Sequence, residues 1–290
     1  MTSANSGLVL VDKPAGVTSQ KAVVHVRKAL GVDRAGHTGT LDPFATGLLL
    51  VLVGRATRLA PFVQDEPKEY EALIRFGVET DTDDVTGKAV RTAAAPSDAA
   101  VRKALAVLTG DVDQVPPTFS AKHVDGRRAY ALARRGKPAE LRPVRVRVER
   151  WQILGLTDGE LRARIRCQSG TYIRALARDL GRLTKSAAHC AELRRLSCGA
   201  FSIDAAVSPD SVTAAHVRPA LAAVAGLATQ ELDDAAALGI AHGRATSASV
   251  AGDRAVLVKD GELLAVAERD GDQWLPRVVL CDPSNLVPRA

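Results

Sequence analysis

The chain has 290 residues, which is long for one compact domain, so a larger domain and a smaller one are expected. Its apolar fraction of 46% is enough to build a full core and argues against a disordered protein. Its net charge of +6 suits a polyanionic partner, whereas an aromatic content of 3% argues against an RNA reader that stacks many bases on aromatic rings.

The cysteines and the N-terminus indicate a cytoplasmic protein. The four cysteines, at positions 167, 190, 198 and 281, contain no CxxC pair, so ordinary buried thiols are expected. The apolar run 8–11 is too short for a signal peptide, and the run 48–53 is typical of a buried strand rather than a membrane span. We therefore expect no association with a membrane.

The first third of the chain predicts strands and a helix around a glycine-rich loop. A buried strand at 8–11 is followed by a helix that has Ser19 as its N-cap and ends at Gly31. The segment 36–47 contains three glycines and leads into the strand that begins at Leu48. The alternation over 69–76 predicts a further strand, with Tyr70 on its apolar face.

The middle of the chain is basic and amphipathic. A helix is predicted over 97–108, and the stretch 122–150 holds the highest density of lysine and arginine. Strands near 144–148 and 161–167 alternate apolar residues with arginines, so each has one apolar and one cationic face. A helix that starts near Thr171 places Arg174, Arg178 and Arg182 on the face opposite its apolar residues.

The last third of the chain changes in character. Alanine-rich sequence to about residue 240 is followed by short strands, including a hairpin over 256–264 whose Asp260-Gly261 pair is a strong turn signal. We expect a catalytic or binding domain over 1–222 and a small β domain over 223–290.

Asp42 stands out as a candidate nucleophile in the loop 36–47. It precedes Pro43, which biases it toward extended backbone, and a carboxylate held on a glycine-bounded loop beside a buried strand suits nucleophilic chemistry. The alternative is a turn residue that caps its own backbone. No Gly-Lys-Ser/Thr closes the loop, so it is not a P-loop, and the acidic loop 81–87 lacks the residue pattern of an EF-hand.

The segment from Gly36 to Leu49 resembles the signature G-H-x-G-x-L-D-P-x-A-x-G-L of TruB-type pseudouridine synthases. Further blocks of that family follow in order across about residues 8–202: D-K-P-x-G at 12–16, G-x-A-T-[KR] at 54–58, K-x-Y at 68–70, T-D-T-D-D at 80–84, Q-x-P-P at 114–117, a block like S-x-G-T-Y-I-R at 169–174, and L-R-R at 193–195. One departure is Phe119, where the family more often has tyrosine.

The resemblance implies an enzyme that isomerises uridine to pseudouridine in the T loop (position 55) of tRNA after base flipping. Asp42 would be the nucleophile, Arg174 its partner, and Tyr70 a residue that packs on the base and takes a proton. The expected substrate-binding residues are His37, Lys13, Pro14, Tyr172, Leu193, Arg164 and Lys122. The family needs no cofactor or metal, and neither a membrane nor an obligate protein partner is implied.

The fold that the resemblance implies is α+β, with a mixed, mainly antiparallel sheet flanked by helices and a small C-terminal β domain similar to PUA modules. The arginine faces of the strands would then contact the tRNA backbone. Two other functions remain open from the residues alone: a tRNA-binding protein without catalysis, and a hydrolase with an aspartate nucleophile. The C-terminal domain would either bind RNA or serve only as a β cap.

Overall fold

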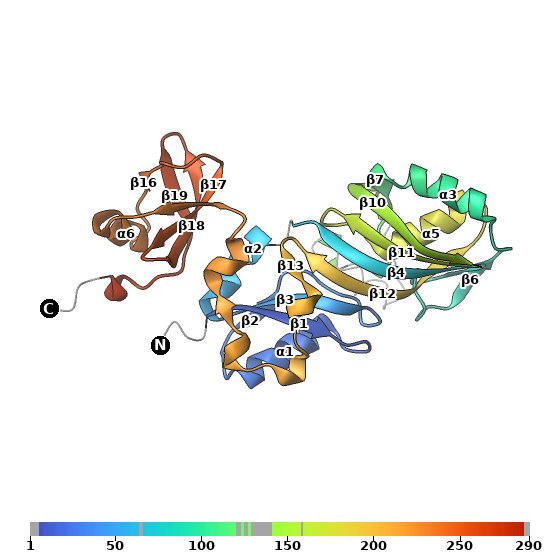
Figure 1. The fold of residues 1–290 in the computed structure, drawn as a ribbon, viewed down its shortest axis with the longest axis horizontal. Coiled ribbons are helices and arrows are strands. Elements are labelled where there is room, and N and C mark those ends of the chain that lie inside the picture. The colour runs from blue at the N-terminus through green and yellow to red at the C-terminus, as the bar shows by residue number, and fades with distance from the viewer. Residues whose placement is uncertain are drawn as a thin grey trace.

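A large sheet with helices on one face makes up most of the molecule, and a small β domain packs against the N-terminal strands from the other face (Figure 1). The structure, a computed structural model, describes residues 6–63, 66–119, 123–124, 127–128, 141–157 and 159–286. The predicted α+β class with a small C-terminal β domain is confirmed.

The main sheet is mixed and mainly antiparallel. It contains ten strands within the described residues, and β3 and β12 are the one parallel pair of neighbours among them. In spatial order the continuous path runs β14 (Arg218–Pro219), β1 (Gly7–Lys13), β3 (Thr46–Val53), β12 (Ala188–Cys198), β4 (Lys68–Phe76), β11 (Glu160–Cys167), β10 (Val144–Thr157) and β7 (Gly110–Gln114). Two short strands pair at its side, β2 (Ala35–His37) with β3 and β13 (Phe201–Ser202) with β12.

Helices cover one face of this sheet. They are α1 (Ser19–Ala29), α3 (Asp98–Val107) and α5 (Ile173–Leu183). Val23, Val101 and Leu176 from these helices share one core with Tyr70 and Ile165 of the sheet, so all three helices lie on the same side. The predicted helices are therefore confirmed, and Ser97 caps α3 by accepting a hydrogen bond from the Ala100 amide.

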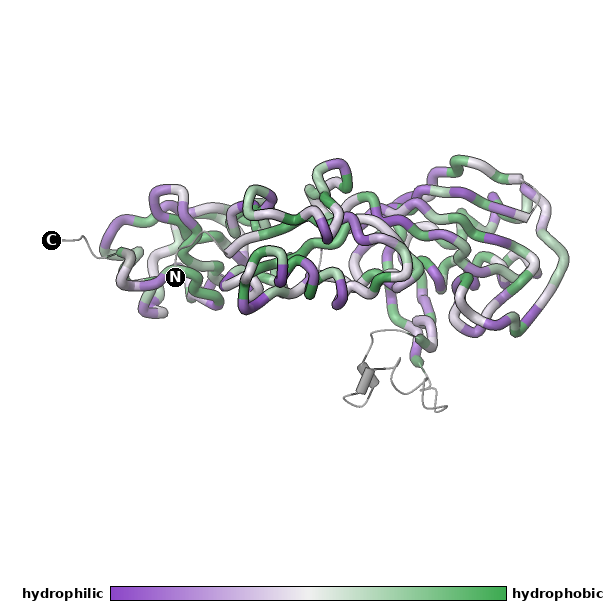
Figure 2. The backbone as a smooth tube through the Cα atoms, turned by 90° about the horizontal axis from the view of Figure 1, so that it is seen from below, coloured by the Kyte–Doolittle hydropathy of each residue, from purple (hydrophilic) through white to green (hydrophobic). Residues whose placement is uncertain are grey.

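Strand β3 is buried on both faces because every residue from 47 to 53 is apolar or glycine. Its alternating side chains are divided between Leu49, Val51 and Val53 in the helix-covered core and Leu48, Leu50 and Leu52 on the opposite face. The second set joins a cluster with Val256 and Leu263 of the C-terminal domain. At the other end of the sheet, which holds β11, β10 and β7, hydrophilic and hydrophobic residues alternate along the tube in Figure 2, as expected where one face is open to solvent.

The C-terminal domain is a five-stranded sheet with one helix. Its elements are β15 (Ala228–Glu231), α6 (Asp234–Ala241), β16 (Thr246–Ser247), β17 (Arg254–Lys259), β18 (Glu262–Asp270) and β19 (Gln273–Val279). The predicted hairpin is the β17–β18 pair, and Asp260 and Gly261 both have positive φ, as a two-residue turn of this kind requires. Trp274 is fully buried at the centre of this domain's own core.

Short elements complete the described chain. They are α2 (Ala60–Val63), the pairs β5 (Val78–Thr80) with β6 (Ala89–Thr92) and β8 (His123–Val124) with β9 (Arg127–Arg128), and the 3₁₀ turns η2 (Gly54–Leu59), η3 (Ile203–Ala205), η4 (Pro209–Ser211), η5 (Ala214–His216), η6 (Ala220–Val224) and η7 (Pro283–Asn285). The pair β5–β6 frames the acidic turn 81–87, which lies against α5 and β12.

Candidate active site

Asp42 lies on the segment between β2 and β3, and backbone hydrogen bonds hold this segment immediately after the carboxylate. The Gly16 amide donates to the Pro43 carbonyl at 2.8 Å, and the Ala45 amide donates to the Asp42 carbonyl at 3.1 Å. The first of these bonds joins the segment to the turn after β1. The Asp42 side chain itself is 32% exposed, so a ligand can reach it.

Ser19 fixes the same segment from the start of α1. Its hydroxyl accepts from the Leu41 amide at 2.8 Å and donates to the Leu41 carbonyl at 2.9 Å. The prediction that Ser19 caps α1 is wrong, since the capping hydroxyl belongs to Thr18, which accepts from the Lys21 amide. The buried Ser19 is instead a brace for the residue before Asp42, and only the contact between distant segments shows this.

Arg174, in the first turn of α5, holds Asp42 with a two-pronged ion pair. Its Nε donates to Asp42 Oδ2 at 2.8 Å and its Nη2 to Oδ1 at 3.1 Å. The guanidinium also donates to the carbonyls of Thr82 at 2.7 Å and Phe119 at 2.9 Å, and the side chain is only 3% exposed. The guanidinium is thus fixed by the fold and fixes the carboxylate in turn.

A second carboxylate, that of Asp84, reaches the same guanidinium. Asp84 Oδ2 lies 3.5 Å from Arg174 Nη1, and its other oxygen accepts hydrogen bonds from the hydroxyls of Thr82 and Thr86. Asp84 is 4% exposed and belongs to the T-D-T-D-D block, for which the sequence predicts no role. Its proximity to Arg174 depends on contacts across about 90 residues of chain, so a local pattern does not reveal it.

The next arginine of α5, Arg178, ties the acidic turn to the helix. It binds Asp83 at 2.8 Å and the Val115 carbonyl at 2.7 Å, and both charged side chains are buried. Burial raises the pKa of Asp83 to about 6, against the opposing charge of Arg178. Only Arg182 of the three arginines on this face extends toward solvent, where it pairs with Glu79 at 2.6 Å. The arginine face of α5 is therefore mainly a buried face.

Tyr70 lies on β4 between Ile165 and Arg195, its direct neighbours on the adjoining strands. It is 7% exposed, and this burial raises the pKa of Tyr70 to about 12, whereas the charge and hydrogen bond of Arg195 act to lower it. The ring shares the core that underlies the Asp42 segment. Arg195 is the second residue near this group for which the sequence predicts no role.

Lys13 is completely buried at the end of β1. Its ammonium donates to the carbonyls of Pro14 at 2.8 Å, Val17 at 2.7 Å and Pro43 at 3.4 Å, which fastens the turn after β1 to the Asp42 segment. Burial lowers the pKa of Lys13 to about 8, and the negative charge of Asp42 opposes this shift. Pro14 is exposed beside it.

Three further predicted residues lie on elements that frame the site. His37 ends β2, Leu193 is buried on β12 two residues before Arg195, and Tyr172 immediately precedes α5. The Tyr172 amide donates to Gln114 Oε1 at 2.9 Å, and Gln114 Nε2 donates to the Tyr172 carbonyl at 3.1 Å. This pair of hydrogen bonds to β7 fixes the chain where it enters the helix that carries Arg174.

Arg164 does not join this group. It pairs in register with Glu71, whereas the next residue, Ile165, pairs with Tyr70, so Arg164 and Tyr70 point to opposite faces of the sheet. The Arg164 guanidinium lies 3.5 Å from the Glu71 carboxylate. Lys122, also predicted to bind substrate, lies outside the described residues.

The other arginines of β10 and β11 share this pattern, since each has an acidic partner on a nearby strand. The pairs are Arg145–Asp113, Arg147–Asp111, Arg150–Glu69, Arg162–Glu71, Arg162–Glu192 and Arg166–Glu149, at 2.7 to 3.4 Å. These five arginines and Arg164 make six positive charges, which balance the six acidic partners. Exposed pairs of this kind contribute about 0–1 kcal/mol each to stability.

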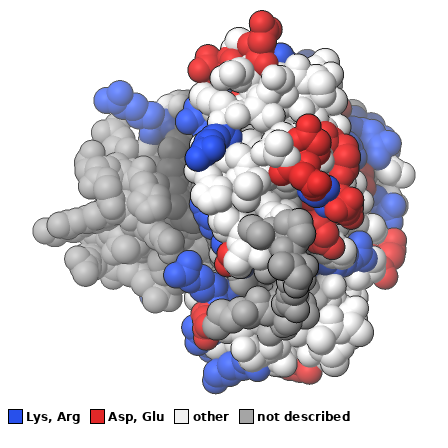
Figure 3. Space-filling view, turned by 90° about the vertical axis from the view of Figure 1, so that its left-hand side faces the viewer, with Lys and Arg blue, Asp and Glu red and all other residues white. Residues whose placement is uncertain are grey.

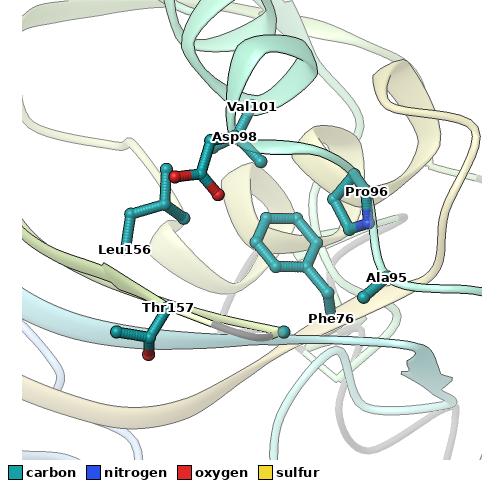
Figure 4. A pocket seen from close by; sticks show the side chains of 8 residues that line it. Phe76, Ala95, Pro96, Asp98, Val101, Leu156 and Thr157 are labelled. Atoms are coloured by element: carbon teal, nitrogen blue, oxygen red, sulfur yellow. The ribbon is translucent and has the colours of Figure 1, made fainter.

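Two hollows of the described residues lie away from Asp42. One, of about 370 Å³, is lined by Phe76, Asp98, Val101 and Leu156 among others, with the Phe76 ring along its wall (Figure 4). Phe76 is six residues beyond Tyr70 on β4, about 20 Å along the strand. The other, of about 610 Å³, lies between α1 and η4.

Neither a metal site nor a membrane-spanning helix emerges from the described residues. No three His, Cys, Asp or Glu side chains within them are grouped as metal ligands. None of the helices in that part of the chain combines the length and the apolar character needed to cross a bilayer.

Comparison with known proteins places these features in context. Residues 27–173 match the family model described as TruB family pseudouridylate synthase, N-terminal domain. The chain is 40% identical to tRNA pseudouridine synthase B of Aromatoleum aromaticum, over 93% of this chain and 90% of that one. It is 41% identical to the protein of the same name from Mycobacterium sp. strain KMS, over 97% of each chain.

Solved structures support the fold. The chain superposes on a crystal structure of a Cbf5-Nop10-Gar1 complex with a TM-score of 0.75 and 22% identity, covering 98% of this chain and 87% of that one. It superposes on an H/ACA RNP bound to a substrate RNA containing 2'-deoxyuridine with a TM-score of 0.73 and 21% identity, covering 97% and 87% of the two chains. These matches extend through the C-terminal β domain as well as the main sheet.

Proposed function

The chain belongs to the TruB family of pseudouridylate synthases, and from this premise we propose that it isomerises uridine 55 in the T loop of tRNA with Asp42 as the nucleophile. It is a tRNA pseudouridine synthase, an isomerase. The observation that best supports the proposed mechanism is the two-pronged pair between Asp42 and the buried Arg174, which leaves 32% of the Asp42 side chain open to a ligand.

The reaction places clear demands on such a site. The bond between N1 of uracil and C1′ of ribose breaks, C5 becomes bonded to C1′, a proton leaves C5 and one is gained at N1. No atom is added or lost, so no group donor or redox partner is needed. Asp42 would attack the nucleoside while Arg174 keeps the carboxylate oriented, which lowers the cost of reaching the transition state.

Base flipping is part of the proposal. The Asp42 carboxylate is paired with the buried Arg174 and lies within electrostatic reach of the buried Lys13, and a base stacked within an RNA helix cannot reach it. The target uridine would therefore leave its stack before reaction. We propose that the RNA next to the flipped base contacts His37, Pro14, Tyr172 and Leu193. A substrate-binding role is also proposed for Arg164 and Lys122, although Arg164 points to the opposite face of the sheet from Tyr70 and Lys122 lies outside the described residues.

Pseudouridine mapping tests the proposed function. The purified protein is incubated with an unmodified tRNA transcript, and pseudouridine is located by chemical modification and primer extension. One pseudouridine at position 55 is expected, and a transcript with cytidine at that position should gain none. Conversion at other positions only would refute the assignment to the T loop, and no conversion of any transcript would refute the activity.

Replacing Tyr70 with phenylalanine separates stacking from proton transfer. The Phe variant keeps the ring and loses the hydroxyl, so its single-turnover rate should fall by about 100-fold or more while tRNA binding is retained, since acid–base catalysis typically contributes roughly 10²–10⁴-fold. Tyr70→Leu, which loses ring and hydroxyl, should be slower still. A Phe variant within a few-fold of wild type would leave Tyr70 with a stacking role only.

The charge-balanced strands predict which arginines matter little for tRNA. Because Arg147 and Arg162 are each paired with acids, Arg147→Gln and Arg162→Gln should change the dissociation constant for tRNA by less than about twofold. The slope of log affinity against log salt should also stay unchanged, whereas each lost phosphate contact would reduce it by roughly 0.7 to 0.9. Measuring tRNA affinity from low to moderate salt tests this prediction. A reduced slope in either variant would indicate that the arginine face of β10 and β11 contacts RNA.

The C-terminal domain is proposed to be a PUA-like RNA-binding domain over 223–290, following a catalytic domain over 1–222. Acidic side chains gather on the end of this domain that Figure 3 faces. Within the domain, Asp234 and Asp260 both approach Lys259, at 2.8 and 3.5 Å, and the Glu231 carboxylate accepts from the Asp260 amide. Since such an end repels phosphate, RNA would bind to another face.

A further inference from the structure

Arg195 is a deeply buried cation without a carboxylate partner among the described residues. It is 2% exposed, and no ion pair within that part of the chain includes it, whereas the other two buried arginines, Arg174 and Arg178, are each paired with aspartates. Burying an arginine costs several kcal/mol unless its charge and its donors are satisfied. Its position near the proposed nucleophile therefore calls for an explanation.

The contacts of Arg195 join the parts of the active site. Its Nε donates to the Leu48 carbonyl at 2.6 Å, and its Nη2 donates to the Gly39 carbonyl at 3.1 Å, so it holds the segment that carries Asp42 near both of its ends. Across the strand pair it is the direct register partner of Tyr70, and its positive charge acts to lower the pKa of that phenol. A Cβ on Gly39 would lie 3.6 Å from Arg195 Nη1, which indicates close packing of the loop on the guanidinium.

The buried Lys68 lies two residues before Tyr70 on the same face of β4, but Arg195 is the cation that acts most directly on the Tyr70 phenol. Two buried thiols flank it, Cys167 of β11 and Cys198 of β12, and both stay neutral because burial raises their pKa values. The ammonium of Lys13 lies within electrostatic reach of Arg195 and adds positive charge. The group that best compensates a negative charge on the phenol oxygen is therefore Arg195.

The chemistry of isomerisation creates such a charge if Tyr70 moves the proton. A phenol that gives its proton to N1 and takes the one that leaves C5 ends the cycle unchanged, but it is a phenolate between the two steps. In a buried site this phenolate needs a counter-charge and a fixed hydrogen bond.

We propose that Arg195 is the positioning residue for Tyr70, holding its hydroxyl toward the nucleotide and compensating the phenolate that forms during proton transfer. This proposal rests on the proton-transfer role proposed for Tyr70. The strand supplies a matched control in Arg194, the preceding residue, which points to the opposite face and pairs with Asp12 at 2.8 Å.

Turnover measurements come first. Arg195→Met should lower the single-turnover rate by about 100-fold, with tRNA affinity kept within about threefold, because the effect acts on chemistry rather than on binding. Arg195→Lys keeps the charge, so its single-turnover rate should be at least about tenfold higher than that of Arg195→Met. The control Arg194→Met should stay within about threefold of wild type. A loss in Arg195→Met that appears only as weaker binding, or no gain from lysine, overturns the proposal.

A spectroscopic measurement distinguishes compensation from a purely structural role. Fluorotyrosine is placed at position 70, and its protonation is followed by ¹⁹F NMR against pH, since the fluorinated phenol is more acidic than tyrosine and titrates at lower pH. The midpoint should rise by about one pH unit or more in Arg195→Met, return toward wild type in Arg195→Lys, and stay unchanged in Arg194→Met. An unchanged midpoint in Arg195→Met overturns the proposal.

The outcome of this test can be distinguished from a failure of the proposed function. The NMR titration needs no turnover, so it reads the Arg195–Tyr70 interaction even if the RNA substrate is assigned wrongly. If Arg195→Met does not fold, the lysine variant carries the test through both readouts, and a lysine variant with wild-type rate and a shifted midpoint would count against the proposal.

Discussion

Asp42→Asn is expected to abolish pseudouridine formation, with a loss of at least about 10⁴-fold in single-turnover rate, because the amide cannot attack the nucleoside. The geometry predicts that little else changes. The introduced asparagine can still accept a hydrogen bond from Arg174, and the segment around it remains fastened through Leu41 and Pro43. Affinity for tRNA should therefore stay within about tenfold, or about 1.4 kcal/mol.

The chain offers a matched control for this variant. Asp12 also forms a two-pronged pair, with Arg194 at 2.8 and 3.1 Å, but on the opposite face of the sheet. Asp12→Asn should keep activity within a few-fold of wild type. If Asp42→Asn turns over at a substantial rate, Asp42 is not the nucleophile. If it instead loses tRNA binding altogether, its carboxylate serves binding.

Arg174→Met should cost both rate and stability. Asp84 would become a buried carboxylate without its cation and Asp42 would lose its orientation, so we expect a loss of about 10²–10³-fold in rate. Removing one partner of a buried pair also destabilises a fold by about 3–5 kcal/mol. Single-turnover kinetics and urea unfolding of the same preparations measure the two losses.

Arg174→Lys and Arg178→Met help to separate the two effects. Lysine keeps the charge but cannot make the two-pronged pair, so its stability loss should be smaller while its rate stays well below wild type. Arg178→Met removes the Asp83 pair and should lower stability while leaving the Arg174–Asp42 pair in place. If Arg174→Met unfolds like wild type and reacts within about tenfold of its rate, Arg174 has no part in the site.

Local patterns predict much of this molecule. The alternation over 161–167 predicts β11 and its two faces, the spacing of apolar residues predicts α1, α3 and α5, and Asp260-Gly261 predicts the turn of the β17–β18 hairpin. These features follow from the sequence because strand and helix periods depend on residues that are close along the chain. The resemblance to the TruB family in turn predicts the group formed by Asp42 and Arg174.

Tertiary structure determines which residues pack against each face of these helices and strands. The arginine face of α5 is buried because the acidic turn 81–87, about 90 residues earlier, folds onto it. The arginines of β11 point away from Tyr70 and are neutralised by acids such as Glu71, a partner set by strand register. Whether Arg195 reaches Tyr70, or Ser19 braces Leu41, is likewise a matter of contacts between distant segments. A sequence determines the period of a strand or helix locally, but the burial and charge of a side chain depend on the neighbours that long-range packing brings to it.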